Sequence, residues 1–190
     1  MMKSVLMFML YLPVFAFAKP LFIGDSLTYS LATSAKKYLP VEGIYKESTG
    51  LTDRSAVKWN EYVQTISFQD YETVVISLGA NDGIGESQIV GYRHKATQFI
   101  RRIQQDNPSA SVVWVLPPAM KNTVMENALK YTREAIRQAA EETRISLFDP
   151  KVALGEGYAR EIRGVQVRTE DGIHYTHKGS DLIIRALMGQ

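Results

Sequence analysis

Hydrophobic and polar positions form two kinds of segment along residues 19–190. Apolar runs without polar alternation, at 73–78 and 111–116, indicate strands that are buried on both faces of a sheet. Longer segments with apolar residues three and four positions apart, such as 87–105, indicate amphipathic helices. This alternation of strand and helix patterns predicts an α/β protein, with a parallel sheet covered by helices on both faces.

The same patterns predict the other elements. Further strands are expected at 21–23, 43–46 and 145–148, and further helices at 27–38, 53–66, 122–143 and 178–188. Residues 150–175 show no clear period and are expected to be irregular. The sequence contains no repeat, low-complexity tract or linker, so we expect residues 19–190 to form one domain.

Residues 1–18 have the layout of a secretory signal peptide. Lys3 precedes an apolar run that ends in Ala16-Phe17-Ala18, a small-x-small cleavage pattern. A membrane anchor is an alternative, but a spanning helix needs about 20 apolar residues. A buried first strand is another, although strands are rarely so long. We expect cleavage after Ala18, export to the periplasm or the medium, and no membrane span afterwards.

The composition limits the classes of function that this protein can have. The chain has 190 residues, of which 45% are hydrophobic and 22% charged, as in globular proteins with a sizeable core. The formal net charge of +2 does not favour nucleic acid as a partner. The absence of cysteine excludes disulfides and a thiol nucleophile. Without a helical histidine pair, an acidic cluster or a glycine-rich phosphate loop, neither a metal nor another cofactor is expected.

Polar residues and glycines follow the predicted strands. In an open parallel sheet, ligands bind beyond the carboxyl ends of the strands. The segments expected at this edge are Gly24-Asp25-Ser26, Ser48-Thr49-Gly50, Gly79-Ala80-Asn81-Asp82 and, before the last helix, Asp171-Gly172-Ile173-His174. Groups that are far apart in the sequence are thus expected to meet at one edge of the sheet.

In order and spacing, these segments resemble the four blocks of the SGNH (GDSL) hydrolases: Gly24-Asp25-Ser26-Leu27, Gly50, Gly79-Ala80-Asn81-Asp82 and Asp171-x-x-His174. Trp59, the stretch VVWVLPPAM and Arg168 are similar to a bacterial, envelope-directed branch of that superfamily. The resemblance implies a three-layer, flavodoxin-like fold with a five-stranded sheet of order 2-1-3-4-5. It also implies a serine esterase mechanism.

Ser26 has two interpretations. Serine is a common N-cap, but a hydroxyl at a helix start also lies near the positive end of the helix, which favours an anionic intermediate. With the other blocks present, we expect Ser26 to be the nucleophile. His174 is the expected base and Asp171 the carboxylate that orients it, whereas a structural turn is the alternative. His94 and His177 are expected at the surface.

Gly50 and Asn81 are candidate oxyanion donors, together with the amide of Ser26. If the second and third strands flank the first, these three groups would converge on one oxygen. Gly50 could instead be an ordinary turn glycine, and Asn81 a turn former. Asp25 and Asp82 are expected to organise loops.

The expected reaction is hydrolysis of short acyl esters, in the first place O-acetyl esters on peptidoglycan or another envelope glycan. A lysophospholipase or thioesterase would need an apolar groove. A non-catalytic glycan-binding module and an acyltransferase remain open as well. The segment 151–170 carries the basic residues Lys151, Arg160, Arg163 and Arg168. They have two interpretations: they favour an anionic substrate, or they simply form a solvated face.

Overall fold

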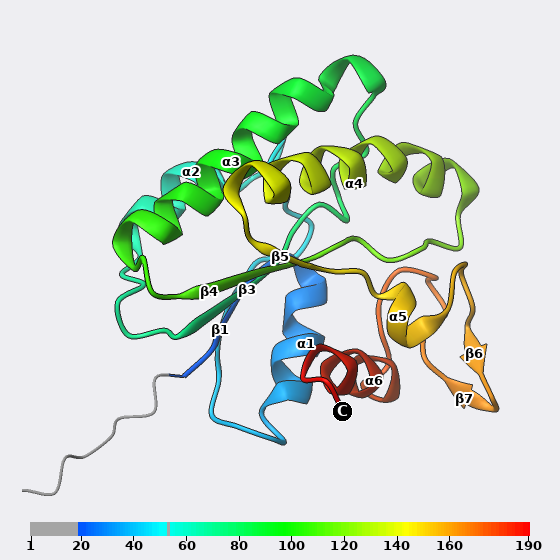
Figure 1. Cartoon of the computed structure of the whole chain (residues 1–190). Coiled ribbons are helices and arrows are strands. Elements are labelled where there is room, and N and C mark those ends of the chain that lie inside the picture. The colour runs from blue at the N-terminus through cyan, green and yellow to red at the C-terminus, as the bar shows by residue number, and fades with distance from the viewer. Residues whose placement is uncertain (1–18, 53) are drawn as a thin grey trace, which may run out of the picture.

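A five-stranded parallel sheet lies between two layers of helices (Figure 1). This computed structural model describes residues 19–52 and 54–190, so the predicted signal peptide lies outside the described residues. The strand order is β2-β1-β3-β4-β5, which confirms the expected order 2-1-3-4-5. The strands are β1 (Leu21–Gly24), β2 (Glu42–Tyr45), β3 (Thr73–Ser77), β4 (Ser111–Val115) and β5 (Ser146–Phe148).

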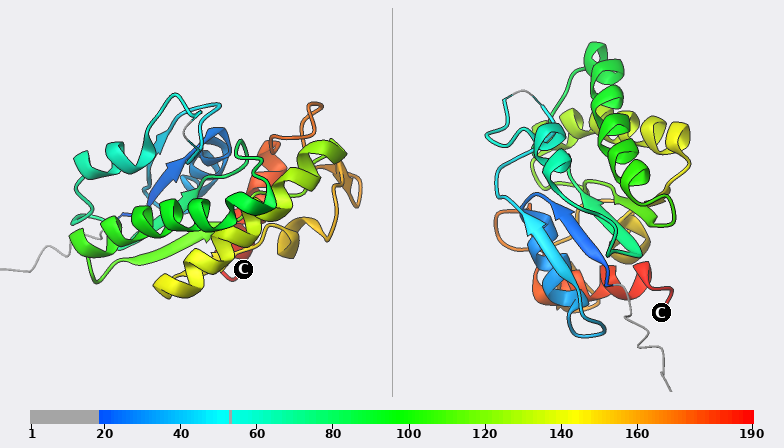
Figure 2. Two further views of the ribbon diagram at one scale, coloured as in Figure 1. Left: turned by 90° about the horizontal axis from the view of Figure 1, so that it is seen from above. Right: turned by 90° about the vertical axis from the view of Figure 1, so that its left-hand side faces the viewer.

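The helices form one layer on each face of the sheet (Figures 1 and 2). One layer consists of α1 (Ser26–Ala35), α5 (Lys151–Leu154) and α6 (His177–Leu187). The other consists of α2 (Trp59–Tyr62), α3 (Ile89–Asp106) and α4 (Thr123–Thr143), with the 3-10 turns η1 (Val63–Thr65) and η2 (Glu86–Gln88). No helix among the described residues is long and apolar enough to cross a bilayer.

The uninterrupted apolar runs are explained by burial on both faces of the sheet. Successive strand residues point to opposite faces. In β3, Val74 and Ile76 pack with α3 and α4, whereas Val75 packs with α1 and α6. On β4, Trp114 is fully buried and its indole N–H donates to the Leu78 carbonyl at 3.1 Å, so its polar atom is satisfied.

The predicted helix at 53–66 is wrong in extent. Within the described part of this segment, only Trp59–Tyr62 is α-helical, followed by the turn Val63–Thr65. Trp59 and Val63 are buried at helical spacing, but Ala56 is exposed. The chain just before it is fixed by other contacts, because the amides of Leu51 and Thr52 donate to the Asp82 carboxylate.

Residues 150–175 are less irregular than predicted. They contain the short helix α5 and a hairpin of β6 (Glu161–Ile162) and β7 (Val165–Gln166). The two-residue loop of Arg163 and Gly164 has φ of 49° and 76°, as a tight turn between antiparallel strands requires. Two-residue strands are too short for a hydrophobic period to show in the sequence.

Two helix glycines should respond in opposite ways to alanine. Both occupy the third position of a helix, Gly91 in α3 and Gly179 in α6. A Cβ at Gly91 meets no atom within 4 Å, so Gly91→Ala should raise the free energy of unfolding by about 0.5–1 kcal/mol.

A Cβ at Gly179 would lie 2.0 Å from the Val167 carbonyl oxygen, so Gly179→Ala should lower the free energy of unfolding by about 1–3 kcal/mol. Urea unfolding of both variants measures the two effects. If Gly179→Ala were as stabilising as Gly91→Ala, the close approach of α6 to Val167 would be incorrect.

Candidate active site

Ser26 is the first residue of α1, directly beyond the end of β1. Asp25 is the N-cap of this helix, because its carboxylate accepts a hydrogen bond from the Leu27 amide at 3.0 Å. The interpretation of Ser26 as the cap is therefore wrong, and its hydroxyl is available for another contact. Helix geometry leaves the first amides of α1 without intrahelical partners.

The Ser26 hydroxyl contacts His174. Ser26 Oγ lies 2.9 Å from His174 Nε2, and His174 Nδ1 lies 2.7 Å from Asp171 Oδ2. Asp171 Oδ1 accepts from the amides of Ile173 and His174 at 2.7 and 3.0 Å and from the Thr169 hydroxyl at 2.6 Å. The structure thus joins Ser26, His174 and Asp171 in one hydrogen-bonded chain.

The charge on Asp171 determines the direction of these bonds. Partial burial opposes ionisation, but the hydrogen bonds from His174, Thr169 and the two amides outweigh it and hold the pKa of Asp171 well below its usual range. The ionised carboxylate can only accept, so Nδ1 of His174 is the donor in this bond. Nε2 is the nitrogen left to accept the proton of the Ser26 hydroxyl, as proton abstraction requires.

Asn81 and Gly50 lie in neighbouring loops after β3 and β2. The Asn81 amide group donates to the Thr49 carbonyl at 2.9 Å, which leaves its second N–H for another acceptor. The Gly50 amide donates to Ser55 Oγ at 3.0 Å. It would have to share or release this bond in order to stabilise an oxyanion.

Two buried carboxylates support these loops. Asp82 accepts from the amides of Leu51 and Thr52 and from the Tyr92 hydroxyl. Gly50 packs directly against it, since a Cβ there would lie 2.1 Å from Asp82 Oδ1. Burial raises the pKa of Asp25 to about 7, and the nearby Asp82 charge adds to the rise.

A polar hollow of about 300 Å³ lies beside Gly50 and Asn81. Ser48, Thr52 and Arg54 contribute to its lining. Thr52 and Arg54 also line a second hollow, of about 410 Å³, along the start of α3. Together they offer hydrogen-bonding groups over an extended surface on the Asn81 side of the site.

The other residues singled out in the sequence lie elsewhere. His94 and His177 are exposed, as predicted. Trp59 supports a site loop, because its indole N–H donates to Thr49 Oγ1 at 3.0 Å. Arg168 is buried, with 2% of its surface exposed, so neither interpretation of the basic segment applies to it. Arg160 does lie on the solvated face, where it pairs with Glu170.

Some features of the site were not predicted from the sequence. The bond from Gly50 to Ser55 and the contact of Trp59 with Thr49 join residues whose spacing follows no motif. The capping role of Asp25 could have been found, because aspartate is as good an N-cap as serine. Among residues 19–52 and 54–190, no group of three or more His, Cys, Asp or Glu side chains could hold a metal ion.

The strand order and the two helical layers give the fold of solved GDSL-type proteins, the fold that the sequence resemblance implied. The chain belongs to the family described as "protein of unknown function (DUF459)", which it matches over residues 19–190. No curated protein matches the sequence.

Solved structures share the fold at low sequence identity. A candidate lipolytic protein of the G-D-S-L family from Desulfitobacterium hafniense DCB-2 is 16% identical, with a TM-score of 0.69 over 90% of this chain and 97% of that one. A lipase/acylhydrolase from Enterococcus faecalis is 15% identical, with a TM-score of 0.63 over 90% and 96%. A peptidoglycan O-acetylesterase is 19% identical, with a TM-score of 0.59 over 78% of this chain and 45% of that one.

The raised pKa of Asp25 predicts a specific pH dependence of stability. Between about pH 4 and about pH 7 the folded protein retains a proton on this carboxyl that the unfolded chain has lost, so the free energy of unfolding should fall as the pH rises. The depressed pKa of Asp171 changes the free energy of unfolding only at pH values below this range.

Asp25→Asn keeps the side chain neutral at every pH, so its stability should depend less on pH across that window. Urea unfolding of the wild type and the variant at several pH values measures the difference. Parallel curves for the two proteins would show that Asp25 is not protonated by burial.

Proposed function

We propose that the protein is a serine esterase that removes short acyl groups, above all O-acetyl groups, from a cell-envelope glycan. The observation that carries this proposal is the hydrogen-bonded chain from Ser26 through His174 to Asp171. These hydrogen bonds join a nucleophile, a base and an orienting carboxylate at the distances that acyl transfer uses.

The reaction follows from the geometry. Ser26 Oγ attacks the ester carbonyl while its proton moves to His174 Nε2, and Asp171 stabilises the resulting imidazolium. The oxyanion accepts from the Ser26 amide and the second N–H of Asn81; the Gly50 amide joins if the Ser55 hydroxyl moves away. His174 then protonates the departing alcohol. Water, deprotonated by His174, then attacks the acyl carbonyl, and His174 returns that proton to Ser26 Oγ as the acid is released.

The surroundings of Ser26 favour a sugar over a fatty acyl chain. The hollow beside Gly50 and Asn81 is lined by hydroxyl, amide and charged groups that match a polyhydroxylated ligand. A lipid acyl hydrolase would need an apolar groove at the nucleophile. An apolar groove of about 500 Å³ lies elsewhere, between α5, the β6–β7 hairpin and α6; Ala153, Ile162, Val165 and Leu182 line it, with charged side chains such as Arg163 and Asp181.

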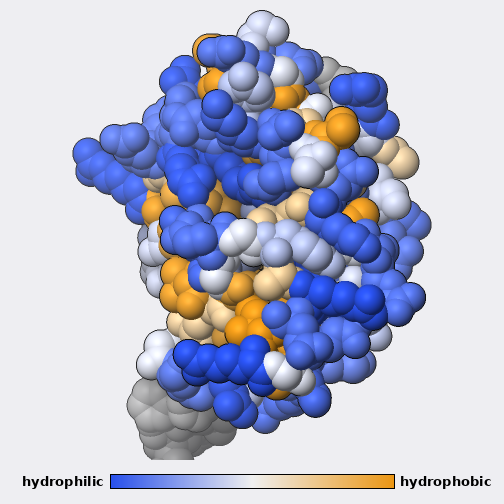
Figure 3. Space-filling view, turned by 90° about the vertical axis from the view of Figure 1, so that its right-hand side faces the viewer, coloured by the Kyte–Doolittle hydropathy of each residue, from blue (hydrophilic) through white to orange (hydrophobic). Residues whose placement is uncertain are grey.

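Figure 3 shows the side of the molecule that carries the hairpin, α5 and α6, with apolar areas enclosed by hydrophilic side chains. Ser26 and His174 do not line that groove. The lysophospholipase or thioesterase alternative therefore receives no support from it.

Two exposed tyrosines beside the nucleophile add to the case for a glycan. Tyr29 lies one helical turn after Ser26, and Tyr45 pairs in register with Gly24. The two residues are 51% and 42% exposed, and their ring centroids are 5.2 Å apart. Tyrosine presents an apolar face with a polar tip, which suits the face of a sugar ring. The similarity to a peptidoglycan O-acetylesterase and the layout of residues 1–18 point to the same substrate class.

Turnover of p-nitrophenyl acetate and acetate release from O-acetylated peptidoglycan test the proposal. Ser26→Ala and His174→Ala should each lower kcat by a factor on the order of 10³ or more, because nucleophile and base act as one unit. His177→Ala is the matched control: it removes an exposed histidine three residues away and should keep the wild-type rate. Circular dichroism verifies that each variant is folded.

Wild-type turnover by folded Ser26→Ala would refute the esterase assignment. A series of nitrophenyl esters of increasing chain length separates the substrate classes, because the polar hollow beside Gly50 and Asn81 predicts a preference for acetyl over long acyl chains. Faster turnover of the long esters would favour the lipid acyl hydrolase. Hydrolysis of small esters without acetate release from any envelope polymer would refute the glycan substrate alone.

A further inference from the structure

Arg168 is a buried cation in an unusual environment. Arginine is almost never fully buried unless it is paired. Here the guanidinium lies over two tyrosine rings, 5.4 Å from the centroid of Tyr158 and 5.2 Å from that of Tyr175. Tyr175 directly follows His174, so Arg168 lies just beneath the segment that carries the candidate base.

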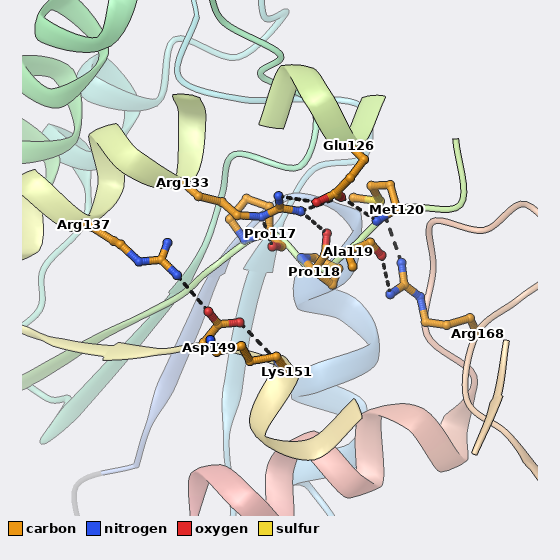
Figure 4. Close-up of polar contacts among 10 residues, drawn as sticks. All are labelled: Pro117, Pro118, Ala119, Met120, Glu126, Arg133, Arg137, Asp149, Lys151 and Arg168. Atoms are coloured by element: carbon orange, nitrogen blue, oxygen red, sulfur yellow. Dashed lines mark hydrogen bonds and ion pairs between the residues drawn. The ribbon is translucent and has the colours of Figure 1, made fainter. Parts of the chain in front are cut away.

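The hydrogen bonds of Arg168 end on main-chain carbonyls. Nη1 donates to the Ala119 carbonyl at 3.0 Å, and Nη2 donates to the carbonyls of Gly172 and Ile173 at 3.3 and 2.8 Å. Nη2 also contacts Met120 Sδ at 3.8 Å. None of these partners, all within the described residues, is a carboxylate. Figure 4 shows the guanidinium reaching the segment that follows β4.

These carbonyls belong to two segments that are distant in the sequence. Ala119 lies in the loop after β4, whereas Gly172 and Ile173 are the two residues before His174. The segments are in close contact, because the Lys121 amide donates to the Gly172 carbonyl. A single guanidinium therefore fixes the Asp171–His174 turn to a loop that is anchored in the sheet.

Removing a cation from water is costly, and carbonyl dipoles compensate for it less well than a carboxylate does. A hydrophobic side chain of similar volume would fill this space without that cost. The burial of a charge here is therefore better explained by the geometry it imposes than by the stability it adds.

We propose that Arg168 is a positioning residue that holds His174 Nε2 within reach of Ser26 by fixing the carbonyls of Gly172 and Ile173. This inference rests on the proposed esterase function, in which a displaced imidazole would slow proton transfer. Arg168 itself contacts neither substrate nor the reacting atoms.

Arg133 provides a matched control. It also bonds main-chain carbonyls of the loop after β4, at Pro117 and Pro118, and it pairs with Glu126 (Figure 4). None of these bonds reaches the turn from Asp171 to His174. Arg133→Met thus removes bonds to the same loop from the other side and removes none from the carbonyls before His174.

The experiment compares purified wild type with Arg168→Met, Arg168→Lys and Arg133→Met. Arg168→Met should lower kcat for p-nitrophenyl acetate about 100-fold with KM within about twofold, because a displacement of about 1 Å suffices for such a loss. Arg168→Lys should restore part of kcat, since an ammonium can bond some of the carbonyls. Arg133→Met should keep kcat within about twofold, even if Tm falls.

Proton NMR supplies a readout that does not depend on turnover. The low-field proton of His174 Nδ1, bonded to Asp171, should shift or broaden in folded Arg168→Met and persist in Arg133→Met. If Arg168→Met does not fold, Arg168→Lys decides by the same two measurements.

A folded Arg168 variant with wild-type kcat and an unchanged low-field proton overturns the proposal. Equal losses of kcat in the Arg168 and Arg133 variants overturn it as well, because they would indicate general destabilisation. If the wild type hydrolyses no ester, the proposed function fails, and the NMR comparison still decides whether Arg168 positions His174.

Discussion

The parallel register of β1 with both of its neighbours determines where the polar groups that follow β1, β2 and β3 lie. Gly24, the last residue of β1, pairs with Tyr45 of β2 and with Ser77 of β3. The three strands therefore end at the same level, and Ser26, Gly50 and Asn81 follow within a few residues. A shift of one residue in either pairing would turn the side chains of that strand to the opposite face and separate these groups. The interleaved β-branched residues of the core fix the register, because each face packs against its own helical layer.

The fourth segment reaches this edge through tertiary contacts alone. His174 is bonded to Ser26 across 148 positions of sequence, and the strand ladder of the sheet does not place it. Its position depends on α6, which packs against α1, on the Asp171 turn, and on Arg168 beneath. Both halves of the site therefore depend on polar side chains that bond main-chain groups: Asp82 for the loop after β2, and Arg168 for the turn before α6. Burying these charged side chains costs free energy, because they lose their contacts with water. Such a cost is expected where the geometry of a site has to be fixed closely.

These differences explain what could be predicted from the sequence. The central strands and the helix Ile89–Asp106 were predicted because burial on two faces, or on one stripe, leaves a periodic pattern. The segment 53–66 was mispredicted because Trp59 and Val63 are buried at helical spacing in a chain that is largely not helical. The hairpin at 161–166 was missed because its strands have two residues each.

For the site, the order and spacing of the sequence motifs were enough to predict that Ser26, Asp171 and His174 come together. They did not reveal which other residues hold these three in place. The bond of Gly50 to Ser55, the cap at Asp25 and the burial of Arg168 arise from contacts that become visible only in three dimensions. A basic residue in a basic segment is expected in solvent, and only the two tyrosine rings and the three carbonyls around it show otherwise.

The central claim is that Ser26 is an activated nucleophile because His174 accepts its proton. Reaction with a fluorophosphonate, followed by mass spectrometry of the intact protein and its peptides, tests this most directly, since the reagent bonds a serine only where a base deprotonates it. One adduct is expected, on Ser26, that is lost in His174→Ala and retained in His177→Ala. A folded wild-type protein that stays unmodified, or that carries the adduct on another serine such as Ser55, would contradict it.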